Sequence, residues 1–273
     1  MPTIVTHISP HIDDICAVWL LKRYLPAWRK ATVEFVSYDR FEEPVVDTPE
    51  RFHVGVGRGR FDEHKGDVGE CATSLVYAYI NDSVVLNVNE RKALDKLVEW
   101  VRMEDTGRFL ADQYRPFSVP SILEGQFLAK GRDSEAVYGL GTAILDTLLI
   151  VMRNQVDLEA DWERRVEFDS AVGRAVAMTS DVRRVENYAY RMGFPVFVRQ
   201  TRDGRYTEIR AAADSDIDLS GLRRVIASAD PAAGWFFHHS GKMMICGGET
   251  VSEPRPTSLN LDRIVELMGG PAA

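Results

Sequence analysis

Cysteine is scarce in this sequence of 273 residues, and its three cysteines have no paired spacing. We therefore expect Cys16, Cys71 and Cys246 to be reduced core thiols of a cytoplasmic protein rather than disulfide partners. The first residues also lack the charged and then apolar segment of a secretion signal, which agrees with a cytoplasmic location. No internal repeat or low-complexity tract is present.

Positive charge and long apolar runs are in short supply as well. The chain has 33 Lys and Arg against 41 Asp and Glu, which gives a net charge of −8. A broad basic surface for long nucleic acid is therefore not expected, whereas the composition is still compatible with a local basic cleft. The apolar stretch at 139–152 is too short and too interrupted to span a bilayer, so we expect no membrane contact. It is apolar enough for the interior or for the contact surface of a homodimer.

The pattern of apolar residues predicts two domains and a connector. Strand-like segments alternate with helix-like ones over residues 1–155, with strands expected at 3–8, 31–38 and 51–57. This alternation predicts an α/β domain with a parallel sheet, whose ligand site lies beyond the carboxyl ends of the strands. Residues 156–190 are predicted to form a charged helical connector, and residues 191–273 a small α+β domain.

Four of the six histidines fall at predicted strand ends or in the loops just after them, with carboxylates beside them: His7, His11, His53 and His64 with Asp13, Asp14, Asp62 and Glu63. Imidazole and carboxylate together suit manganese, zinc or iron better than calcium. A divalent ion would explain why such an acidic cluster is tolerated. Each motif alone also has an ordinary interpretation, since SPHIDD is typical of a helix start, DEH of a solvated turn and EDTG of a helix end.

The order of these motifs resembles the DHH phosphoesterase superfamily, most closely its MYG-type branch of metal-dependent exoribonucleases. The likeness is carried by four stretches in sequence: THISPHIDD (6–14), HVGVGRGRFDEH (53–64), EDTG (104–107), and FFHHSG (236–241) followed by CGG (246–248). It implies metal ligands at His7, His11, Asp13, His53, Glu63 and Asp105. It also implies that Asp62 orients its neighbours or a water and that His64 contacts the phosphate or assists the leaving group. The second domain would contact the substrate through His238, His239, Ser240, Lys242, Gly247 and Gly248.

Two positions depart from the family pattern. His53 stands where the family has the carboxylate that bridges two metals, and Glu63 stands where it has a ligand histidine. An imidazole bridges two closely spaced metals poorly, because its second nitrogen is usually held by another group. One ion, two ions in an altered geometry, and a degenerate site therefore remain open.

Together these features predict a metal-dependent phosphodiesterase, exonuclease-like and using one or two divalent ions, with manganese expected. Its substrate would be a nucleotide, a short single-stranded oligonucleotide or another small phosphorylated compound, because the net charge is negative. Two alternatives remain open. One is a non-catalytic relative that binds a nucleotide, RNA or a protein through a degenerate metal site, and the other is a pyrophosphatase-like hydrolase.

Overall fold

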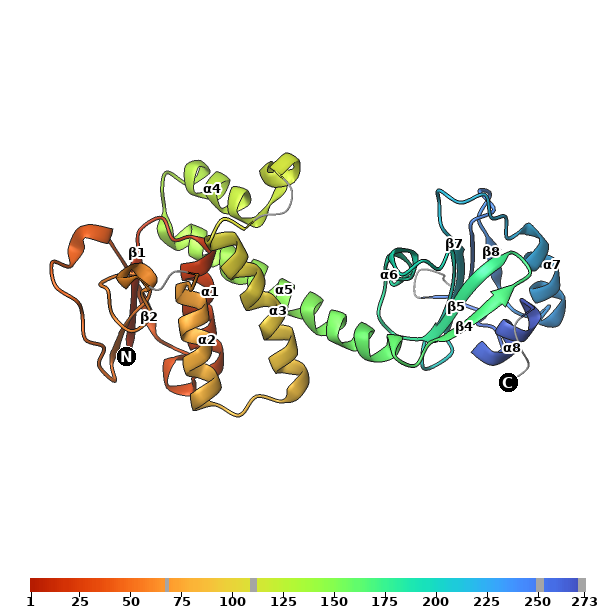
Figure 1. Cartoon of the computed structure of the whole chain (residues 1–273), viewed down its shortest axis with the longest axis horizontal. Coiled ribbons are helices and arrows are strands. Elements are labelled where there is room, and N and C mark those ends of the chain that lie inside the picture. Colours follow the sequence, from red (N-terminus) through yellow and green to blue (C-terminus); the bar gives the residue numbers. More distant parts are fainter. Residues whose placement is uncertain (67–68, 109–111, 249–252, 270–273) are drawn as a thin grey trace. The chain divides into compact units, whose positions relative to one another are not determined.

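The protein is described by a computed structural model that covers residues 1–66, 69–108, 112–248 and 253–269. Its backbone divides into two compact units, Met1–Arg153 and Asn154–Ala273 (Figure 1). The division lies close to the domain end predicted at residue 155. The fold is a mixed α/β structure in which each unit contains its own sheet.

The first unit is built on a three-stranded parallel sheet, as the sequence predicts. Its strands are β1 (Thr3–His7), β2 (Thr32–Val36) and β3 (Arg51–His53), in the order β2-β1-β3. The central strand β1 buries Ile4 and Val5 completely, because it has a neighbour on each side and a covered face. The third strand is shorter than the predicted segment 51–57, since Gly55 and Gly57 take left-handed backbone angles and turn the chain out of the sheet.

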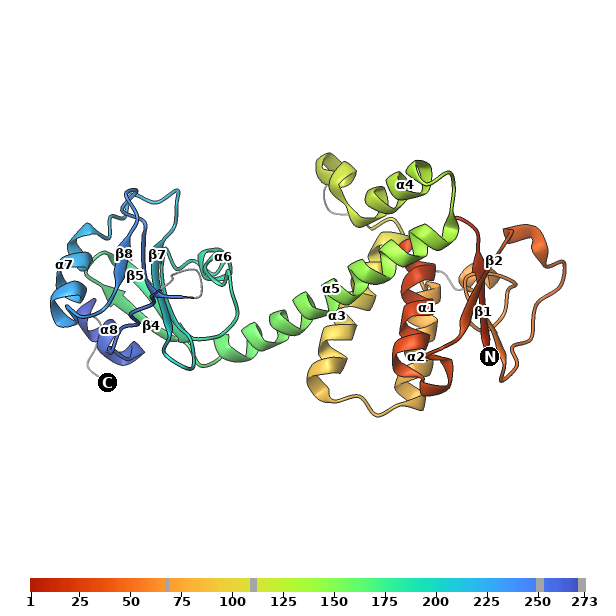
Figure 2. The ribbon, with the colours of Figure 1, turned by 180° about the vertical axis from the view of Figure 1, so that it is seen from behind.

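Helices of the first unit gather on one side of this sheet. The α-helices are α1 (Ile12–Tyr24), α2 (Ala72–Ser83), α3 (Val88–Asp105), α4 (Val119–Ala129) and α5 (Ser134–Trp162), the last of which ends in the second unit. The 3₁₀ helices are η1 (Pro26–Trp28), η2 (Tyr38–Arg40), η3 (Glu63–Lys65) and η4 (Asp112–Phe117). Helices α1, α2 and α3 lie side by side in both views (Figure 1, Figure 2). Helix α5 approaches α1 so closely that a Cβ at Gly141 would lie 2.8 Å from Ile15 Cδ1.

Helix α5 is longer than its sequence indicated. Within the described part of the chain it is long and apolar enough to cross a membrane by length and composition, with a mean hydropathy of 1.5 over 18 residues. The expectation that this stretch is too short was therefore wrong. Length and composition are also met by helices of soluble proteins, so a single such helix is weak evidence for a membrane span.

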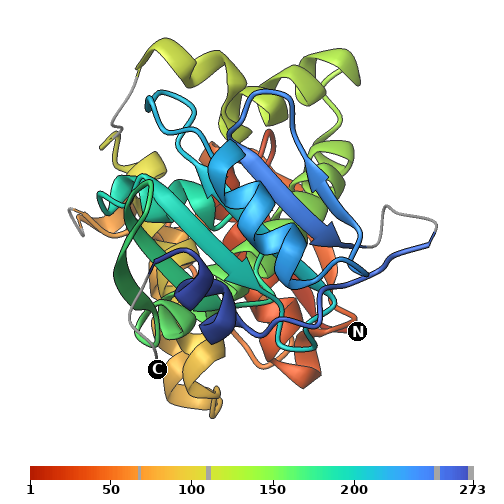
Figure 3. The ribbon, with the colours of Figure 1, turned by 90° about the vertical axis from the view of Figure 1, so that its right-hand side faces the viewer.

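The second unit contains a six-stranded mixed sheet covered on both faces. The strands are β4 (Val166–Ser170), β5 (Gly173–Thr179), β6 (Val196–Gln200), β7 (Tyr206–Ala211), β8 (Trp235–Phe237) and β9 (Met243–Gly247), in the order β4-β5-β6-β7-β9-β8. Helices α7 (Ser220–Ala229) and α8 (Leu261–Leu267) share one face (Figure 3), and α6 (Glu186–Arg191) packs on the other. Strand β5 serves both faces, because alternate side chains point in opposite directions: Ala175 and Ala177 to one, Val176 and Met178 to the other.

The helical connector predicted over residues 156–190 is wrong for most of its length. Residues 166–179 form β4 and β5, which belong to the second unit. The edge strand β4 buries Phe168 and exposes charged neighbours, so its charge concealed the two-residue period of a strand. After residue 195 the chain forms both strands and helices, as expected of an α+β domain, but the compact unit that contains them begins at Asn154 and not at residue 191. Residues 249–252 and 270–273 of the predicted 191–273 domain lie outside the described residues.

Gly247 offers a test of the packing between β7 and β9. Its φ is +79°, and a Cβ added there would lie 1.9 Å from the carbonyl oxygen of Arg205. Gly204 has a similar φ of +69° with nothing within 4 Å, and it is the matched control. Both Gly→Ala changes strain a left-handed residue by about 1–2 kcal/mol, but only Gly247→Ala also forces two strands apart. We expect a clearly larger fall in Tm for Gly247→Ala by circular dichroism, and equal falls would contradict this packing.

Candidate metal centre

The carboxyl end of the parallel sheet gathers acids and histidines from five elements. Within the described residues, three groups hold ligand atoms that lie within 4.8 Å of one another: His7, His11 and Asp14; Asp13, Cys71 and Asp105; Asp62, Glu63 and His64. They come from the end of β1, the start of α1, the start of α2, the end of α3 and η3. The groups also act on one another electrostatically. The charge of Glu63 acts on His7, and the charges of Asp13 and Asp105 act on Glu63, so we treat the three groups as one centre.

His7 and Asp14 form the first part of the centre. The His7 Nε2 lies 2.8 Å from Asp14 Oδ2, and its Nδ1 lies 2.6 Å from the carbonyl oxygen of Ile8. Burial lowers the pKa of His7, but its hydrogen bonds to Asp14 and Ile8 and the Asp14 charge outweigh burial and raise it to about 9. The Asp14 carboxylate also accepts the backbone N–H of His11 at 2.9 Å, which fixes it at the start of α1.

Asp13 joins the starts of two helices. Its carboxylate accepts the backbone N–H groups of Ala72 at 2.9 Å and Thr73 at 2.8 Å, at the amino end of α2. The Thr73 hydroxyl donates in return to the Asp13 carbonyl at 2.8 Å. Burial raises the pKa of Asp13 to about 6, and the charge of Asp14 adds to the rise. Asp105 lies exposed, but partial desolvation of its carboxyl group and the charge of Asp14 also raise its pKa.

Asp62 holds His64 in place within the third part. Its Oδ1 lies 2.8 Å from His64 Nδ1 and accepts the His64 backbone N–H, while its Oδ2 accepts the Arg58 N–H at 2.6 Å. Glu63 differs, because its Oε2 is buried and has no hydrogen-bond partner. Burial raises the pKa of Glu63 to about 7, and the charges of Asp13 and Asp105 act in the same direction.

His53 is not brought into any of the three groups. It lies at the end of β3, where its Nδ1 is 3.1 Å from Asp47 Oδ1 and its backbone N–H donates to the same oxygen. Two residues further, Gly55 reaches the centre instead, since a Cβ there would lie 2.1 Å from Asp14 Oδ1. The chain after β3 therefore brings close-packed backbone to the centre, while His53 pairs with Asp47.

Sequence reasoning placed Asp14 in the acidic cluster without naming it as a metal ligand, and it missed Cys71. Asp14 directly follows Asp13 in the first turn of α1, so a signal for it was present. Cys71 precedes α2 in no recognisable motif, and only the fold brings its sulfur near Asp13 and Asp105.

The predicted substrate residues all belong to the second unit. His238 and His239 follow β8 with their ring centroids 4.2 Å apart, and His238 Nδ1 lies 2.8 Å from Ser240 Oγ. The Lys242 ammonium donates to the backbone carbonyls of Ser215 and Ile217, so its charge already has partners. Gly247 and Gly248 take left-handed backbone angles against the backbone of Arg205 and the ring of Tyr206, which is a structural reason for glycine at both positions.

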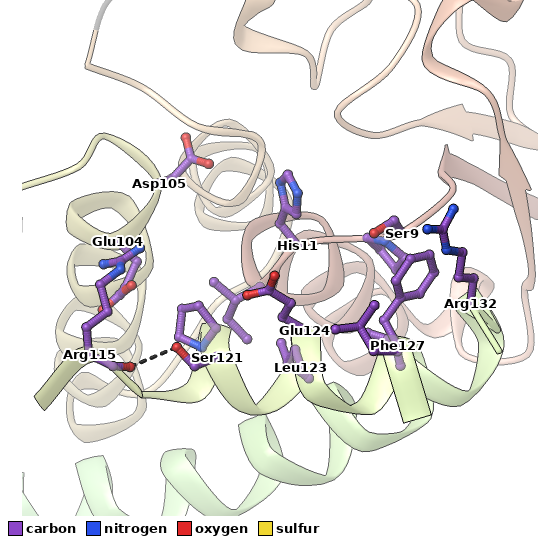
Figure 4. Close-up of a pocket in the computed structure, with 15 residues that line it drawn as sticks. Ser9, His11, Glu104, Asp105, Arg115, Ser121, Leu123, Glu124, Phe127 and Arg132 are labelled. Carbon is purple, nitrogen blue, oxygen red and sulfur yellow. Dashed lines mark hydrogen bonds between the residues drawn. The ribbon is translucent and has the colours of Figure 1, made fainter. Parts of the chain in front are cut away.

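The donor set of this centre fits a divalent cation. Four carboxylates (Asp13, Asp14, Glu63 and Asp105) lie among the imidazoles of His7 and His11, and burial leaves Asp13 and Asp14 poorly solvated. The buried Glu63 oxygen without a partner is an observation that a bound ion would explain. Cavity space is available beside the centre, since a pocket of about 550 Å³ is lined by His11 and Asp105 (Figure 4).

Comparisons with known proteins add little to this geometry. No family model matches the chain, and no curated protein matches it. Among solved structures it is similar to a DHH-domain protein described as a member of the s1p family of ribosomal proteins, with 13% identity, a TM-score of 0.30 and coverage of 98% of this chain and 85% of the other. It is also similar to RecJ from Thermus thermophilus, solved in complex with Mg²⁺, with 12% identity, a TM-score of 0.28 and coverage of 89% of this chain. This chain spans 46% of that RecJ chain. Such TM-scores do not define a shared fold, so the side chains of the centre are the better guide to function.

The raised pKa values predict how stability depends on pH without metal. Folding raises the pKa of Asp13 from 3.8 to about 6 and that of Glu63 from 4.5 to about 7. At a pH between the two pKa values of either group, the folded state therefore binds more protons than the unfolded state. His7, with its pKa raised from 6.5 to about 9, contributes stability that is complete below pH 6.5 and is lost as the pH rises through 9. In EDTA the free energy of unfolding should therefore fall from pH 5 to pH 9. Urea unfolding at a series of pH values measures it.

Glu63→Gln and added manganese provide the controls for this pH dependence. The variant lacks one of the groups that bind protons more tightly in the folded state, so its stability should fall less between pH 5 and pH 7. Manganese should stabilise the wild-type protein more at pH 8 than at pH 5.5, because protons then compete less for the same ligands. A free energy of unfolding that rises from pH 5 to pH 9 in EDTA would contradict the assignment.

Proposed function

We propose that this protein is a metal-dependent phosphoesterase that hydrolyses phosphodiester bonds of short oligonucleotides or nucleotides. One observation carries the proposal: four carboxylates and two imidazoles converge at the carboxyl edge of a parallel sheet, beside a cavity of about 550 Å³. Ligand sites of open α/β sheets lie at this edge. Clustered acids and histidines with raised pKa values are also typical of functional sites.

The residues that would bind the metal are His7, His11, Asp13, Asp14, Glu63 and Asp105. A divalent ion bound there supplies a Lewis acid that polarises a phosphate oxygen and lowers the pKa of a bound water. Manganese suits the mixture of carboxylate and imidazole donors. Asp13 has a second task, because its carboxylate also accepts two N–H groups from α2 and thereby holds the ligand-bearing turn of α1 in place.

In this proposal His64 transfers a proton, and Asp62 orients its imidazole ring. The bond between Asp62 Oδ1 and His64 Nδ1 leaves Nε2 available to a substrate. Burial lowers the pKa of His64, but the hydrogen bond to Asp62 and the charge of Glu63 outweigh it and raise the pKa. A protonated imidazole suits the donation of a proton to a leaving oxygen or a contact with a phosphate.

A non-catalytic binding protein is the second candidate. The engagement of His53 with Asp47 favours it, because the centre then lacks a ligand at the position of the family's bridging carboxylate. A pyrophosphatase-like hydrolase would use the same residues on a different phosphate linkage, and a panel of substrates would separate it from a phosphodiesterase.

Asp105→Asn tests the proposed activity most directly. Asp105 lies exposed at the end of α3, so the change removes a charged ligand with little effect on packing. We expect manganese-stimulated hydrolysis of bis(p-nitrophenyl) phosphate to fall at least about tenfold, the loss seen even when groups that only support metal ligands are removed. Asp82→Asn, an exposed aspartate on α2, is the matched control and should keep full activity. Equal rates for both variants would refute the assignment.

Asp13→Ala should abolish the same activity and also lower the Tm, since it leaves the N–H groups of Ala72 and Thr73 without acceptors. Full manganese-dependent activity in this variant would exclude Asp13 from the centre. Tight manganese binding by the wild-type protein, measured by calorimetry, without turnover of any phosphoester would favour the non-catalytic candidate.

A further inference from the structure

A cavity within the first unit begins at the metal centre and extends beneath α4. Its volume is about 550 Å³, within the range of about 300–1,000 Å³ that is usual for small-molecule sites. The start of α1, the end of α3 and helix α4 supply its walls. His11 and Asp105 line it where it meets the centre, so a ligand in this cavity would touch the residues proposed to act on a phosphate (Figure 4).

Polar groups with no partner face this cavity. Figure 4 shows the Glu124 carboxylate pointing toward His11, and Arg132 beyond it at the end near Ser9. Neither the Glu124 carboxylate nor the Arg132 guanidinium has a hydrogen-bond or ion-pair partner in the described part of the chain. A carboxylate accepts hydrogen bonds but repels phosphate, so Glu124 suits hydroxyl groups next to a phosphate rather than the phosphate itself.

The remaining wall of the cavity is apolar and includes an aromatic ring. Phe127 lies on the same side as Arg132, and the buried Leu123 of α4 also lines the cavity. A flat aromatic group can stack on a phenylalanine ring, and a guanidinium can bond its edge or a second phosphate. From the centre outward, the cavity therefore offers partners for a phosphate, for hydroxyl groups and for a flat ring.

We infer that this cavity binds the nucleoside of a ribonucleotide substrate, with the base against Phe127 and a ribose hydroxyl donating to Glu124. The adjacent phosphate then lies at His11 and Asp105. The inference rests on the proposed function for the identity of that phosphate. Ribose is preferred to deoxyribose, because Glu124 accepts from the 2′-hydroxyl that distinguishes RNA from DNA. The residues that select the nucleoside thus lie on α4 and in the turn after it, within the first unit.

Binding of AMP to the manganese-loaded full-length protein, measured by calorimetry, tests the base contact. Phe127→Ala should weaken AMP binding at least about tenfold, the usual effect of removing a stacking side chain. Phe117→Ala is the matched control, because Phe117 is 80% exposed, precedes α4 and does not line the cavity. Its affinity for AMP should equal that of the wild-type protein. Equal affinities for all three proteins would overturn the inference.

Glu124→Gln tests the sugar contact with AMP and dAMP as the two probes. The wild-type protein should bind AMP more tightly than dAMP, and the ratio of the two affinities should move toward one in the variant. A glutamine keeps the size of the side chain but loses the charge that strengthens a hydrogen bond from a hydroxyl. An unchanged ratio would exclude Glu124 as the ribose contact, and tighter binding of dAMP by the wild-type protein would overturn the preference for ribose.

Hydrolysis of bis(p-nitrophenyl) phosphate separates a failure of this inference from a failure of the proposed function. If the wild-type protein hydrolyses this compound but does not bind AMP, the phosphoesterase activity is supported and the nucleoside site is refuted. If AMP binds in a manner that depends on Phe127 while no phosphoester is hydrolysed, the nucleoside site stands on a non-catalytic protein.

Discussion

The Asp13 carboxylate accepts two backbone N–H groups from the amino end of α2, and the geometry of the centre depends on this contact. A helix start carries N–H groups without partners and a partial positive charge, so a buried carboxylate is stabilised there. Because Asp13 belongs to the first turn of α1, the same bond fixes α1 against α2. It thereby sets the positions of Asp14 on one side and Cys71 on the other. A residue that looks like a metal ligand in the sequence is thus also part of the scaffold.

The acids of the centre repel one another, and this repulsion explains much of its chemistry. Burial raises the pKa of Asp13 and of Glu63, and the negative charges of neighbouring carboxylates raise both pKa values further. His7 offsets part of this charge through Asp14. Among the described acids of the centre, Glu63 has a buried oxygen without a hydrogen-bond partner. A divalent cation would bind in place of the protons that these acids hold, so metal binding would release protons. The same charge balance would draw phosphate toward the centre only when a cation is bound.

Parallel topology explains which parts of the site could be predicted from sequence. The carboxyl ends of parallel strands meet at one edge, so His7, His11, Asp62 and Glu63 were expected together once the strands were placed. His53 could not be judged this way, because its partner Asp47 lies in an irregular loop without periodicity. Neighbouring acids such as Asp13 and Asp14 point about 100° apart on a helix, and which of them faces α2 depends on packing. Strand β4 was missed because exposed charge on an edge strand resembles a solvated helix.

Helix α4 differs from the rest of the first unit in how it is held, and this difference bears on specificity. Helices α1 and α3 bury continuous apolar faces, whereas α4 buries only Leu123 and leaves Ile122 and Leu128 exposed. Residues that fix a reactive centre need a rigid scaffold, while residues that choose the substrate can vary with little effect on the core. The centre accordingly comes from the sheet edge and from the ends of helices that pack in the core. In the proposed nucleoside site, the contacting groups come from α4 and the turn after it, where substitutions should change recognition without disturbing the acids.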